Sequence, residues 1–565
     1  MKNRVLATIL AVTLISIFVL AGCGGETTTP ATTSTTTATA TATATATTTA
    51  TATATATTTA TATATATSTE PVPVYGGTMR IVAGAIPKVL GYAPEKAPSD
   101  SYYMLPVLEH LCEWGPDGGN LVPVLAESWE MDAAAKTITW HLQKGVSFTD
   151  GTPFNAEAVR WNFQLAIDNS TLTNGQFVES LEVKGDYTLV MHMTRVDWQM
   201  IQNYGLMQPI SPTAFRTAGG TIPADSDIEK SIEWARANAV GTGPFTVSEW
   251  VRDDHITFVK NPNYWREGLP YLDAIEMRAI PDAMVAAATL EAGEADRWME
   301  TNSVVDIINL QGKGLSINWG PGMFNLLLVS SAVETNPLSN VKVREAIECA
   351  LDRPTMAQTL GQGLYEPLHQ MASSTWPGYV EGYDPRPYNT EKAKGLLTEA
   401  GYPNGLTLKV MATSTAGDAM ALLQYYLGEA GIVIDPDIAD LGRYFGSVFG
   451  TGWDDIVLTA SGINPDATDL FVHFGSNPMT FRTTNIWKSD AFKALSDAAL
   501  DPSYMGAADA MPKIREAIRQ AGEDCLFIPL WRSVNACIFQ PYVHTEYIKI
   551  HGIIWTPAED WMEAH

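Results

Sequence analysis

The stretch from Pro123 to Phe163 carries the densest local signals in this sequence. Residues 137–142 alternate Thr, Thr and His with Ile, Trp and Leu, a period of two that is typical of a half-buried strand. The Asp-Gly-Thr-Pro cluster at 150–153 then predicts a turn, because Gly tolerates positive φ and Pro presets φ. A helix should follow directly, with Asn155 as its N-cap. Strand, turn and helix occur in many folds, so the assignment depends on the residues that fill the pattern.

Three later segments read as helices with clear ends. Residues 341–351 place apolar side chains on one face and stop near Pro354. Residues 390–400 have Thr390 as the expected N-cap and a glycine just past their end, and residues 514–521 have the same apolar spacing. Strands and helices mix without strict β-α-β alternation, so the class is α/β or α+β with long excursions.

Several strings together resemble the family 5 extracellular solute-binding proteins, the family of oligopeptide-, dipeptide- and nickel-complex-binding proteins of ABC importers. They are Leu125 to Trp129, Thr137 to Leu142, Gly145 to Pro153, the opening Tyr75 to Val82, Gly241 to Phe245, Asn261 to Trp265, Val341 to Arg353, the helix before Gly401, and Ile528 to Trp531. The resemblance spans about residues 75 to 535, in order. Asp150 and Gly151 also have a purely structural interpretation, in which they build a turn and touch no ligand.

The resemblance implies an α/β, two-lobed fold of the periplasmic-binding-protein type II kind, enlarged by an extra subdomain in the first lobe. By the order of the motifs, the first lobe is 75–117, 240–322 and 526–565, the extra subdomain is 118–239, and the second lobe is 323–525. The chain would cross between lobes near Gly320–Gly322 and again near Cys525–Pro529.

The N-terminus has the layout of a signal peptide. Lys2 and Arg4 precede an apolar run over residues 5–20, which is slightly shorter than a membrane-spanning helix needs. Leu20-Ala21-Gly22-Cys23 resembles a bacterial lipobox, so residues 1–22 are expected to be removed and Cys23 to be lipidated. The alternative is an uncleaved N-terminal anchor helix, which changes the anchor and not the side of the membrane.

Residues 23–74 are dominated by Thr and Ala, and the block TATATATTTA at 41–50 is repeated at 51–60. Without large apolar side chains the entropy of ordering cannot be offset, so we expect a disordered stalk. Such a coil would hold the folded part roughly 40 Å from the membrane. The sequence leaves open whether the stalk is glycosylated.

The formal net charge is −27, and removal of Lys2 and Arg4 with the leader makes it more negative. This acidity excludes nucleic acid and anionic membrane surfaces as expected partners. It fits a solvated surface, with an electrostatic funnel for cationic ligands as the alternative.

Beyond Cys23 the cysteines are Cys112, Cys349, Cys525 and Cys537, which have no metal-finger spacing. They could pair in three ways or remain free thiols, and Cys349 lies in an apolar helical pattern that favours a buried thiol.

Motifs for common catalytic sites are absent from the sequence: there is no phosphate-binding loop, H-E-x-x-H, G-x-S-x-G or strand-linked G-x-G-x-x-G. A carboxylate pair for glycoside hydrolysis stays open, because spacing in space is invisible in sequence. We expect no enzyme, no cofactor, no metal site and a monomer. The leading hypothesis is a lipid-anchored solute-binding protein on the outer face of the cytoplasmic membrane, in the periplasm or at the cell surface. It would bind a peptide-like or other small solute and deliver it to an ABC permease and its ATPase. A secreted hydrolase on a stalk and a surface sensor with the same fold are the alternatives.

Ligand contacts are expected between the lobes. Tyr92, Trp376 and Trp453 are candidate aromatic walls. Peptide-binding relatives carry an aspartate in a W-x-x-D-Y-x-x-P-like segment, where it pairs with the α-ammonium group of the ligand. The matching stretch here ends Ser461-Gly-Ile-Asn464-Pro, so Ser461 takes the place of the aspartate, and free peptide N-termini should bind poorly. Asp454, Asp455 and Asp466 could compensate under a shifted alignment.

Overall fold

The computed structural model describes residues 71–115, 121–462, 467, 469–475, 485–504, 506–545, 547–549 and 553–564. These residues form one unit beginning at Pro71. The predicted leader, the lipidation site Cys23 and the stalk up to residue 70 lie outside the described residues, and so does Asn464.

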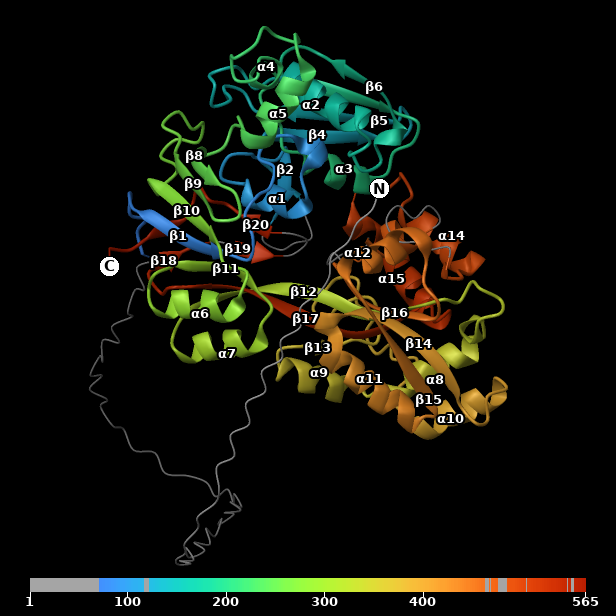
Figure 1. Ribbon diagram of the computed structural model, residues 1–565. Helices are drawn as coiled ribbons and strands as arrows, with labels where there is room; N and C mark the ends of the chain where they lie inside the picture. The colour runs from blue at the N-terminus through green and yellow to red at the C-terminus, as the bar shows by residue number, and fades with distance from the viewer. Residues whose placement is uncertain are drawn as a thin grey trace, which may run out of the picture. The chain divides into compact units, whose positions relative to one another are not determined.

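An eleven-stranded mixed sheet organises the described chain (Figure 1). Ten strands lie in the order β15, β14, β16, β12, β17, β11, β1, β10, β9, β8, and β13 pairs with β17. We call β1 and β8 to β11 the first half, and β13 to β16 the second half. The first half comprises β1 (Thr78–Ala83), β8 (Phe245–Val251), β9 (His255–Lys260), β10 (Ala274–Ala279) and β11 (Arg297–Thr301). The second half comprises β13 (Glu366–Pro367), β14 (Leu406–Thr413), β15 (Ile432–Ala439) and β16 (Ile456–Ser461).

Two long antiparallel strands, β12 (Ser316–Val329) and β17 (Phe527–Phe539), run through both halves. β17 pairs with β11 through Phe539, Ile538 and Ala536, whereas β12 pairs with β16 over residues 324–329. The covalent chain therefore passes between the halves within these two neighbouring strands.

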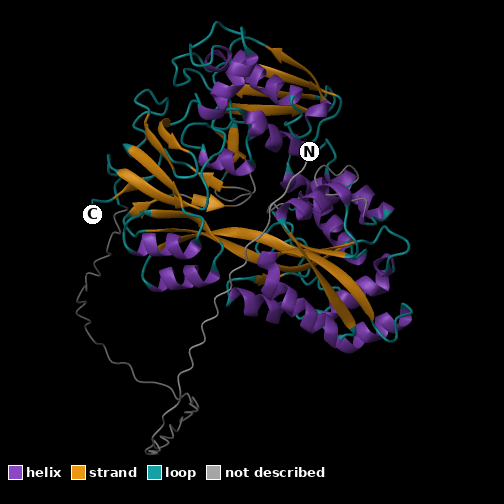
Figure 2. Ribbon diagram, viewed as in Figure 1, coloured by secondary structure: helices purple, strands orange, loops and turns teal. Residues whose placement is uncertain are grey.

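Core clusters cover both faces of the second half, as alternation along β12 shows. Leu326 and Leu328 enter one cluster, and Leu327 and Val329 enter another. Helices cover the two faces (Figure 2). One face carries α8 (Val341–Ala350), α9 (Arg353–Gly361), α10 (Thr390–Glu399) and α11 (Gly417–Glu429). The other carries α12 (Leu441–Gly446), α13 (Asp469–Phe474), α14 (Asp490–Ala499) and α15 (Ala507–Glu523).

The first half is covered in the same way. One face packs on α1 (Pro98–Tyr103), α4 (Pro212–Arg216) and α5 (Ile228–Ala237), and the other packs on α6 (Ala283–Glu291) and α7 (Val304–Gly312). Short pairs complete it: β2 (Cys112–Trp114) with β3 (Leu121–Pro123), β18 (Val543–His544) with β21 (Trp561–Met562), and β19 (Tyr547–Lys549) with β20 (Ile553–Trp555).

A separate four-stranded sheet contains the two strands of the stretch from Pro123 to Phe163. Its order is β4 (Ala126–Asp132), β5 (Thr137–Leu142), β7 (Thr188–Met193), β6 (Val178–Val183), and α2 (Ala156–Asp168) and α3 (Trp198–Gly205) pack on it. In β5 the residues Ile138, Trp140 and Leu142 are buried, which confirms the predicted alternation. Asn155 caps α2 by accepting a hydrogen bond from the Ala158 N–H at 2.9 Å, as predicted.

The turn predicted at Asp150 and Gly151 is also confirmed. Gly151 has φ of 82°, a region that favours glycine. Asp150 Oδ1 accepts hydrogen bonds from the Thr152 N–H and hydroxyl, and its Oδ2 accepts one from Ser211, the N-cap of α4. The signature aspartate therefore fixes the turn and the start of a helix.

One helix start differs from the sequence expectation, and one predicted helix end agrees with it. The N-cap of α10 is Asn389, whose side chain accepts from the Lys392 N–H, and Thr390 is the first helical residue, so the Thr390 prediction was wrong. The helix over 341–350 ends before Pro354, which lies in the first turn of α9, where proline is tolerated.

Cys112, Cys349, Cys525 and Cys537 are all buried free thiols, so none of the three pairings forms. In the described part of the chain, no helix is long and apolar enough to span a membrane.

Candidate functional site

The passage between the two halves has an irregular backbone. Gly320 lies opposite Asn535 and Pro321 opposite Val534, and the register then shifts before Phe324 pairs with Arg532. A Cβ on Gly322 would lie 2.3 Å from the carbonyl oxygen of Ser533, so only glycine fits there. If the first passage is at Gly320–Gly322, this register puts the second near Ser533–Asn535, C-terminal to the Cys525–Pro529 prediction.

A side-chain cluster lies immediately on the second-half side of this passage. We call it the crossing cluster: Phe324, Glu366, Trp376, Ser461 and Arg532. Phe324 is the strand partner of both Ser461 and Arg532, and its ring centroid lies 5.0 Å from that of Trp376. The Arg532 guanidinium lies over Trp376, 5.4 Å from the ring centroid, which is within cation–π range.

The charges in the crossing cluster are paired. Arg532 Nε lies 2.9 Å from Glu366 Oε2. Burial alone would raise the pKa of Glu366, but hydrogen bonds from Ser373 and the Ser374 N–H, with the charge of Arg532, hold it below its usual value. Burial lowers the pKa of Arg532, and Glu366 partly opposes this. The pair is thus a fixed, nearly neutral platform that presents an aromatic ring and hydrogen-bonding groups.

On the first-half side, Asn535 contributes the feature that points most directly to a ligand. Its Nδ2 donates to Glu300 Oε2 at 3.3 Å, while its buried Oδ1 accepts no hydrogen bond from the described residues. A buried acceptor without a donor costs roughly 1–3 kcal/mol. Tyr103 is in the same neighbourhood, and burial, followed by the charges of Glu300 and Asp100, raises its pKa to about 12. An N–H or O–H group of a solute would relieve the unmet acceptor.

The predicted site residues fall in different places. Trp376 and Ser461 meet in the crossing cluster, where Ser461 is buried at the end of β16. Tyr92 is 5% exposed and stacks on Phe215 in the core of the first half. Trp453 is 8% exposed and borders a separate cavity of about 200 Å³, next to the Lys409–Asp454 ion pair. The structure thus groups two of the predicted residues.

Arg532, Glu366 and Asn535 were missed by sequence reasoning. A polar residue directly after the apolar run Phe527 to Trp531 was the available signal for Arg532. Glu366 and Asn535 carry no local signal, because strand pairing across long sequence separations brings them to the passage. Among the described residues, no group of three or more His, Cys, Asp or Glu side chains is arranged to hold a metal ion.

The four-stranded sheet contributes a contact with the second half. Trp198, the first residue of α3, is 2% exposed and packs in the core cluster of α13 to α15. Its Nε1 donates to the carbonyl oxygen of Ala499 at the end of α14, at 3.3 Å. Opening of the space between these parts would therefore expose this indole.

We expect Trp198→Ala to lengthen the mean distance between spin labels at Glu179 on β6 and Asp490 on α14, because burial of a large aromatic contributes about 1.5–3 kcal/mol to the contact. Trp129→Ala is the matched control, since Trp129 packs on Trp140 within the same sheet. Distance distributions from electron paramagnetic resonance report the effect. Equal distributions for wild type and Trp198→Ala would show that this contact does not hold the two parts together.

Comparison with known proteins identifies the family to which this chain is similar. Residues 120–480 match the model of the bacterial extracellular solute-binding proteins, family 5. The glutathione-binding protein GsiB of Escherichia coli O1:K1 is 29% identical over 338 residues, which cover 59% of this chain and 64% of that relative, less than two thirds of its length. These relatives are binding proteins, not enzymes.

Solved structures share the fold. DppA from Helicobacter pylori, in complex with the peptide STSA, is 22% identical, with a TM-score of 0.71 over 87% of this chain and 99% of that one. NikA from Brucella suis, in complex with Fe(III)-EDTA, is 20% identical, with a TM-score of 0.69 over 83% and 96%. The fold is therefore the two-lobed α/β fold of periplasmic binding proteins. With the family model matching more than half of its length, this chain belongs to family 5 of the bacterial extracellular solute-binding proteins.

Proposed function

We propose that the protein is an extracytoplasmic, lipid-anchored solute-binding protein that captures a peptide-like or other small solute between its lobes and delivers it to an ABC importer. Family membership supports the transport role. The single observation that carries the location of the site is the unmet Asn535 Oδ1 at the passage between the halves, on the same strand, β17, as Arg532 of the crossing cluster.

The mechanism is closure of the lobes about β12 and β17. A solute that contacts both sides favours the closed state by its difference in affinity for the two states. Ser533 ties the strands together there: its hydroxyl accepts from the Met323 N–H at 3.0 Å and donates to the Met323 carbonyl at 3.2 Å. Met323 itself is 43% exposed, so apolar surface is available beside the passage.

The solute class is tested by a thermal-shift screen of free peptides, N-acetylated peptides and uncharged solutes. Ser461 can accept a hydrogen bond from an ammonium group but cannot neutralise it, and a desolvated unpaired charge is costly. We therefore expect little stabilisation by free peptides, whereas a true ligand at 100 times its Kd adds about 2.7 kcal/mol. Strong stabilisation by free peptides that disappears on N-acetylation would contradict the role given to Ser461.

Variants then locate the site. For any solute found, Trp376→Ala and Asn535→Ala should weaken binding at least about tenfold, the equivalent of 1.4 kcal/mol. Tyr425→Ala is the control, because that tyrosine is 62% exposed on α11. Unchanged affinity in both site variants would move the site away from the passage. Recovery of altered solute by mass spectrometry would instead support the hydrolase alternative.

The lipid anchor rests on the sequence of residues 1–23. We expect Cys23→Ala to release the protein from membranes without changing its melting temperature, since lipid chains contribute about 0.8 kcal/mol per buried CH₂ to anchoring and nothing to the fold. Fractionation followed by immunoblotting measures the release. Retention of the mutant in the membrane fraction would favour the uncleaved anchor helix.

A further inference from the structure

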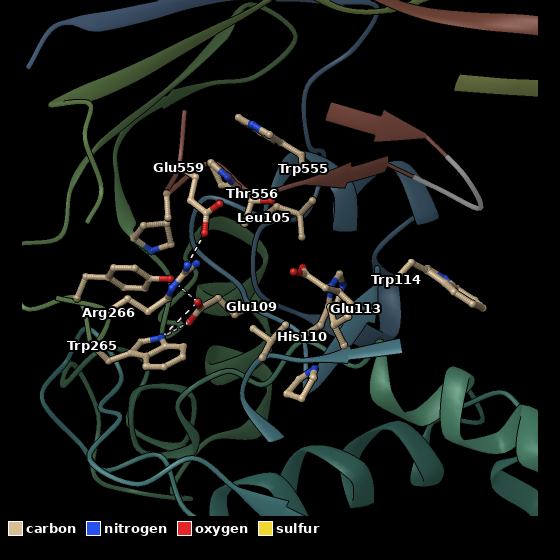
Figure 3. Close-up of a pocket in the computed structure, with 17 residues that line it drawn as sticks. Leu105, Glu109, His110, Glu113, Trp114, Trp265, Arg266, Trp555, Thr556 and Glu559 are labelled. Carbon is tan, nitrogen blue, oxygen red and sulfur yellow. Dashed lines mark hydrogen bonds and ion pairs between the residues drawn. The ribbon is translucent and has the colours of Figure 1, made fainter. Parts of the chain in front are cut away.

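A cavity of about 340 Å³ lies away from the crossing cluster, and none of the five cluster residues borders it (Figure 3). It opens between the segment Leu105–Trp114, the end of β3 at 122–124, the turn Tyr264–Arg266 and the C-terminal segment Trp555–Glu559. Its size is within the range of small-molecule sites.

The aromatic walls of this cavity are fixed by their own hydrogen bonds. Trp265 Nε1 donates to Glu109 Oε2 at 2.9 Å, and Trp555 Nε1 donates to Asp560 Oδ2 at 2.6 Å. The buried Arg297 guanidinium also lies 4.7 Å from the Trp555 ring centroid. Rings held in this way need no rearrangement to receive a ligand, so the walls are pre-formed.

Most of the charges around the cavity are already satisfied. Arg266 forms an ion pair with Glu559. Glu109 accepts hydrogen bonds from the hydroxyls of Thr242 and Tyr264, both at 2.7 Å, in addition to Trp265. Burial, with the nearby charge of Lys96, lowers the pKa of His110 to about 3, so this imidazole is neutral.

Glu113 is the exception. No described residue donates a hydrogen bond or forms an ion pair with its carboxylate, and Figure 3 shows the side chain directed back toward Glu109 and Arg266 while Trp114 points the other way. Burial, then the charge of Glu109, raises the pKa of Glu113 to about 7, and Arg266 only partly opposes this. Arg266 and Glu559 cancel each other, and burial raises the pKa of Glu109 as well, so the unpaired negative charge of the cavity is that of Glu113 when it is ionised.

We propose that this cavity is a second small-molecule site, separate from the site between the lobes, and that it binds a small organic cation. The ammonium or guanidinium head would supply Glu113 with its missing partner, and the carbon skeleton would lie against Trp265, whose face attracts cations, with the edge of the buried Trp555 beside it. A neutral or anionic molecule of the same shape gains neither interaction.

Isothermal titration of the full chain tests this with benzylamine, putrescine, agmatine and choline, against benzyl alcohol and benzoate as neutral and anionic counterparts. At least one cation should bind with one-to-one stoichiometry, and the counterparts should not. Cations stay charged over the range used, so affinity should rise about tenfold from pH 6 to pH 8 as Glu113 becomes ionised. Glu113→Gln should weaken binding at least tenfold and remove the pH dependence.

Trp376→Ala is the control for the site between the lobes and should leave cation binding unchanged. Glu334→Gln, an exposed carboxylate elsewhere, controls for net charge. If Glu113→Gln does not fold, the pH profile and the counterpart series of the wild-type protein still decide. Absence of binding by all four cations at about 10 mM, or equal binding of benzyl alcohol, overturns the proposal.

Discussion

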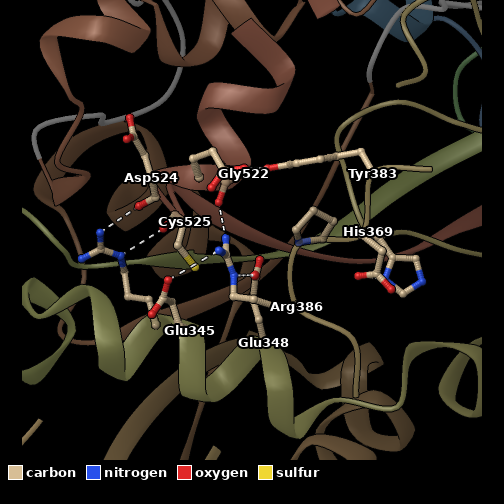
Figure 4. A network of polar contacts seen from close by, with 12 residues as sticks. Glu345, Glu348, His369, Tyr383, Arg386, Gly522, Asp524 and Cys525 are labelled. Atoms are coloured by element: carbon tan, nitrogen blue, oxygen red, sulfur yellow. Dashed lines mark hydrogen bonds and ion pairs between the residues drawn. The ribbon is translucent and has the colours of Figure 1, made fainter. Parts of the chain in front are cut away.

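Replacing Arg386 by Met should lower the free energy of unfolding by about 3–5 kcal/mol, because it leaves buried acceptors without their charged partner. Arg386 is 5% exposed and forms an ion pair with Glu348 on α8, and it donates to the Gly522 carbonyl near the end of α15. Figure 4 shows these groups converging from separate elements. Burial tends to lower the pKa of Arg386, but the Glu348 carboxylate raises it overall, so the guanidinium is charged.

The same network continues along α8 to the start of β17. Arg344 Nη2 donates to the Asp524 carbonyl at 2.8 Å and its Nε to the Cys525 carbonyl at 3.0 Å. In the Arg386→Met variant, Glu348 would keep only Arg353, 3.7 Å away. The network thus fixes the segment Asp524–Cys525, which leads into β17. Loss of the network should therefore shift the position of β17.

Urea unfolding followed by circular dichroism measures the Arg386→Met effect. Lys394→Met is the matched control, because Lys394 pairs with Glu391 on the exposed face of α10 and such pairs contribute only about 0.3–0.5 kcal/mol. A midpoint for Arg386→Met that equals the control would show that water, and not this guanidinium, satisfies Glu348 and Gly522.

Gly322→Ala should destabilise the protein by about 1–3 kcal/mol or more, because the new Cβ would be forced against the backbone of Ser533 at 2.3 Å and neither strand can move without breaking its pairing. We also expect looser coupling of the two halves, since Ser533 holds the Met323 backbone at this point.

Gly312→Ala is the control with the opposite sign. A Cβ on Gly312, the last residue of α7, would meet nothing within 4 Å, and alanine favours the helix by up to about 1 kcal/mol. Differential scanning calorimetry compares the two variants. Equal melting temperatures for Gly322→Ala and wild type would mean that β12 and β17 leave room for a side chain at position 322, and that the close backbone approach does not constrain this residue.

The local units of this fold could be predicted from sequence because their signals are local. The alternation of apolar and polar residues predicted β5, the Asn155 cap predicted α2, and the apolar face of 514–521 predicted α15. The Thr390 cap was wrong because Asn389 and Thr390 are adjacent residues that can both cap a helix, and the choice depends on backbone conformation.

The candidate site was less accessible from sequence. Trp376 and Ser461 could be named, but their meeting through Phe324 depends on the pairing of β12 with β16, which joins residues more than a hundred positions apart. Tyr92 is an aromatic residue of the kind that lines ligand sites, but it lies in a packed core. Its burial in the structure distinguishes these two roles, and the sequence alone cannot. The unmet Asn535 acceptor is visible only once every neighbouring donor has been placed.

The central claim is that solute bound between the lobes favours their closure about β12 and β17. The most direct test is the distance distribution between spin labels at Glu179 and Asp490 in a Cys23→Ala background, where the four remaining cysteines are buried. Saturating solute should narrow the distribution and move it to the shorter distance, and Trp198→Ala should oppose this shift. Tight binding of a solute with no change in the distribution would contradict the account.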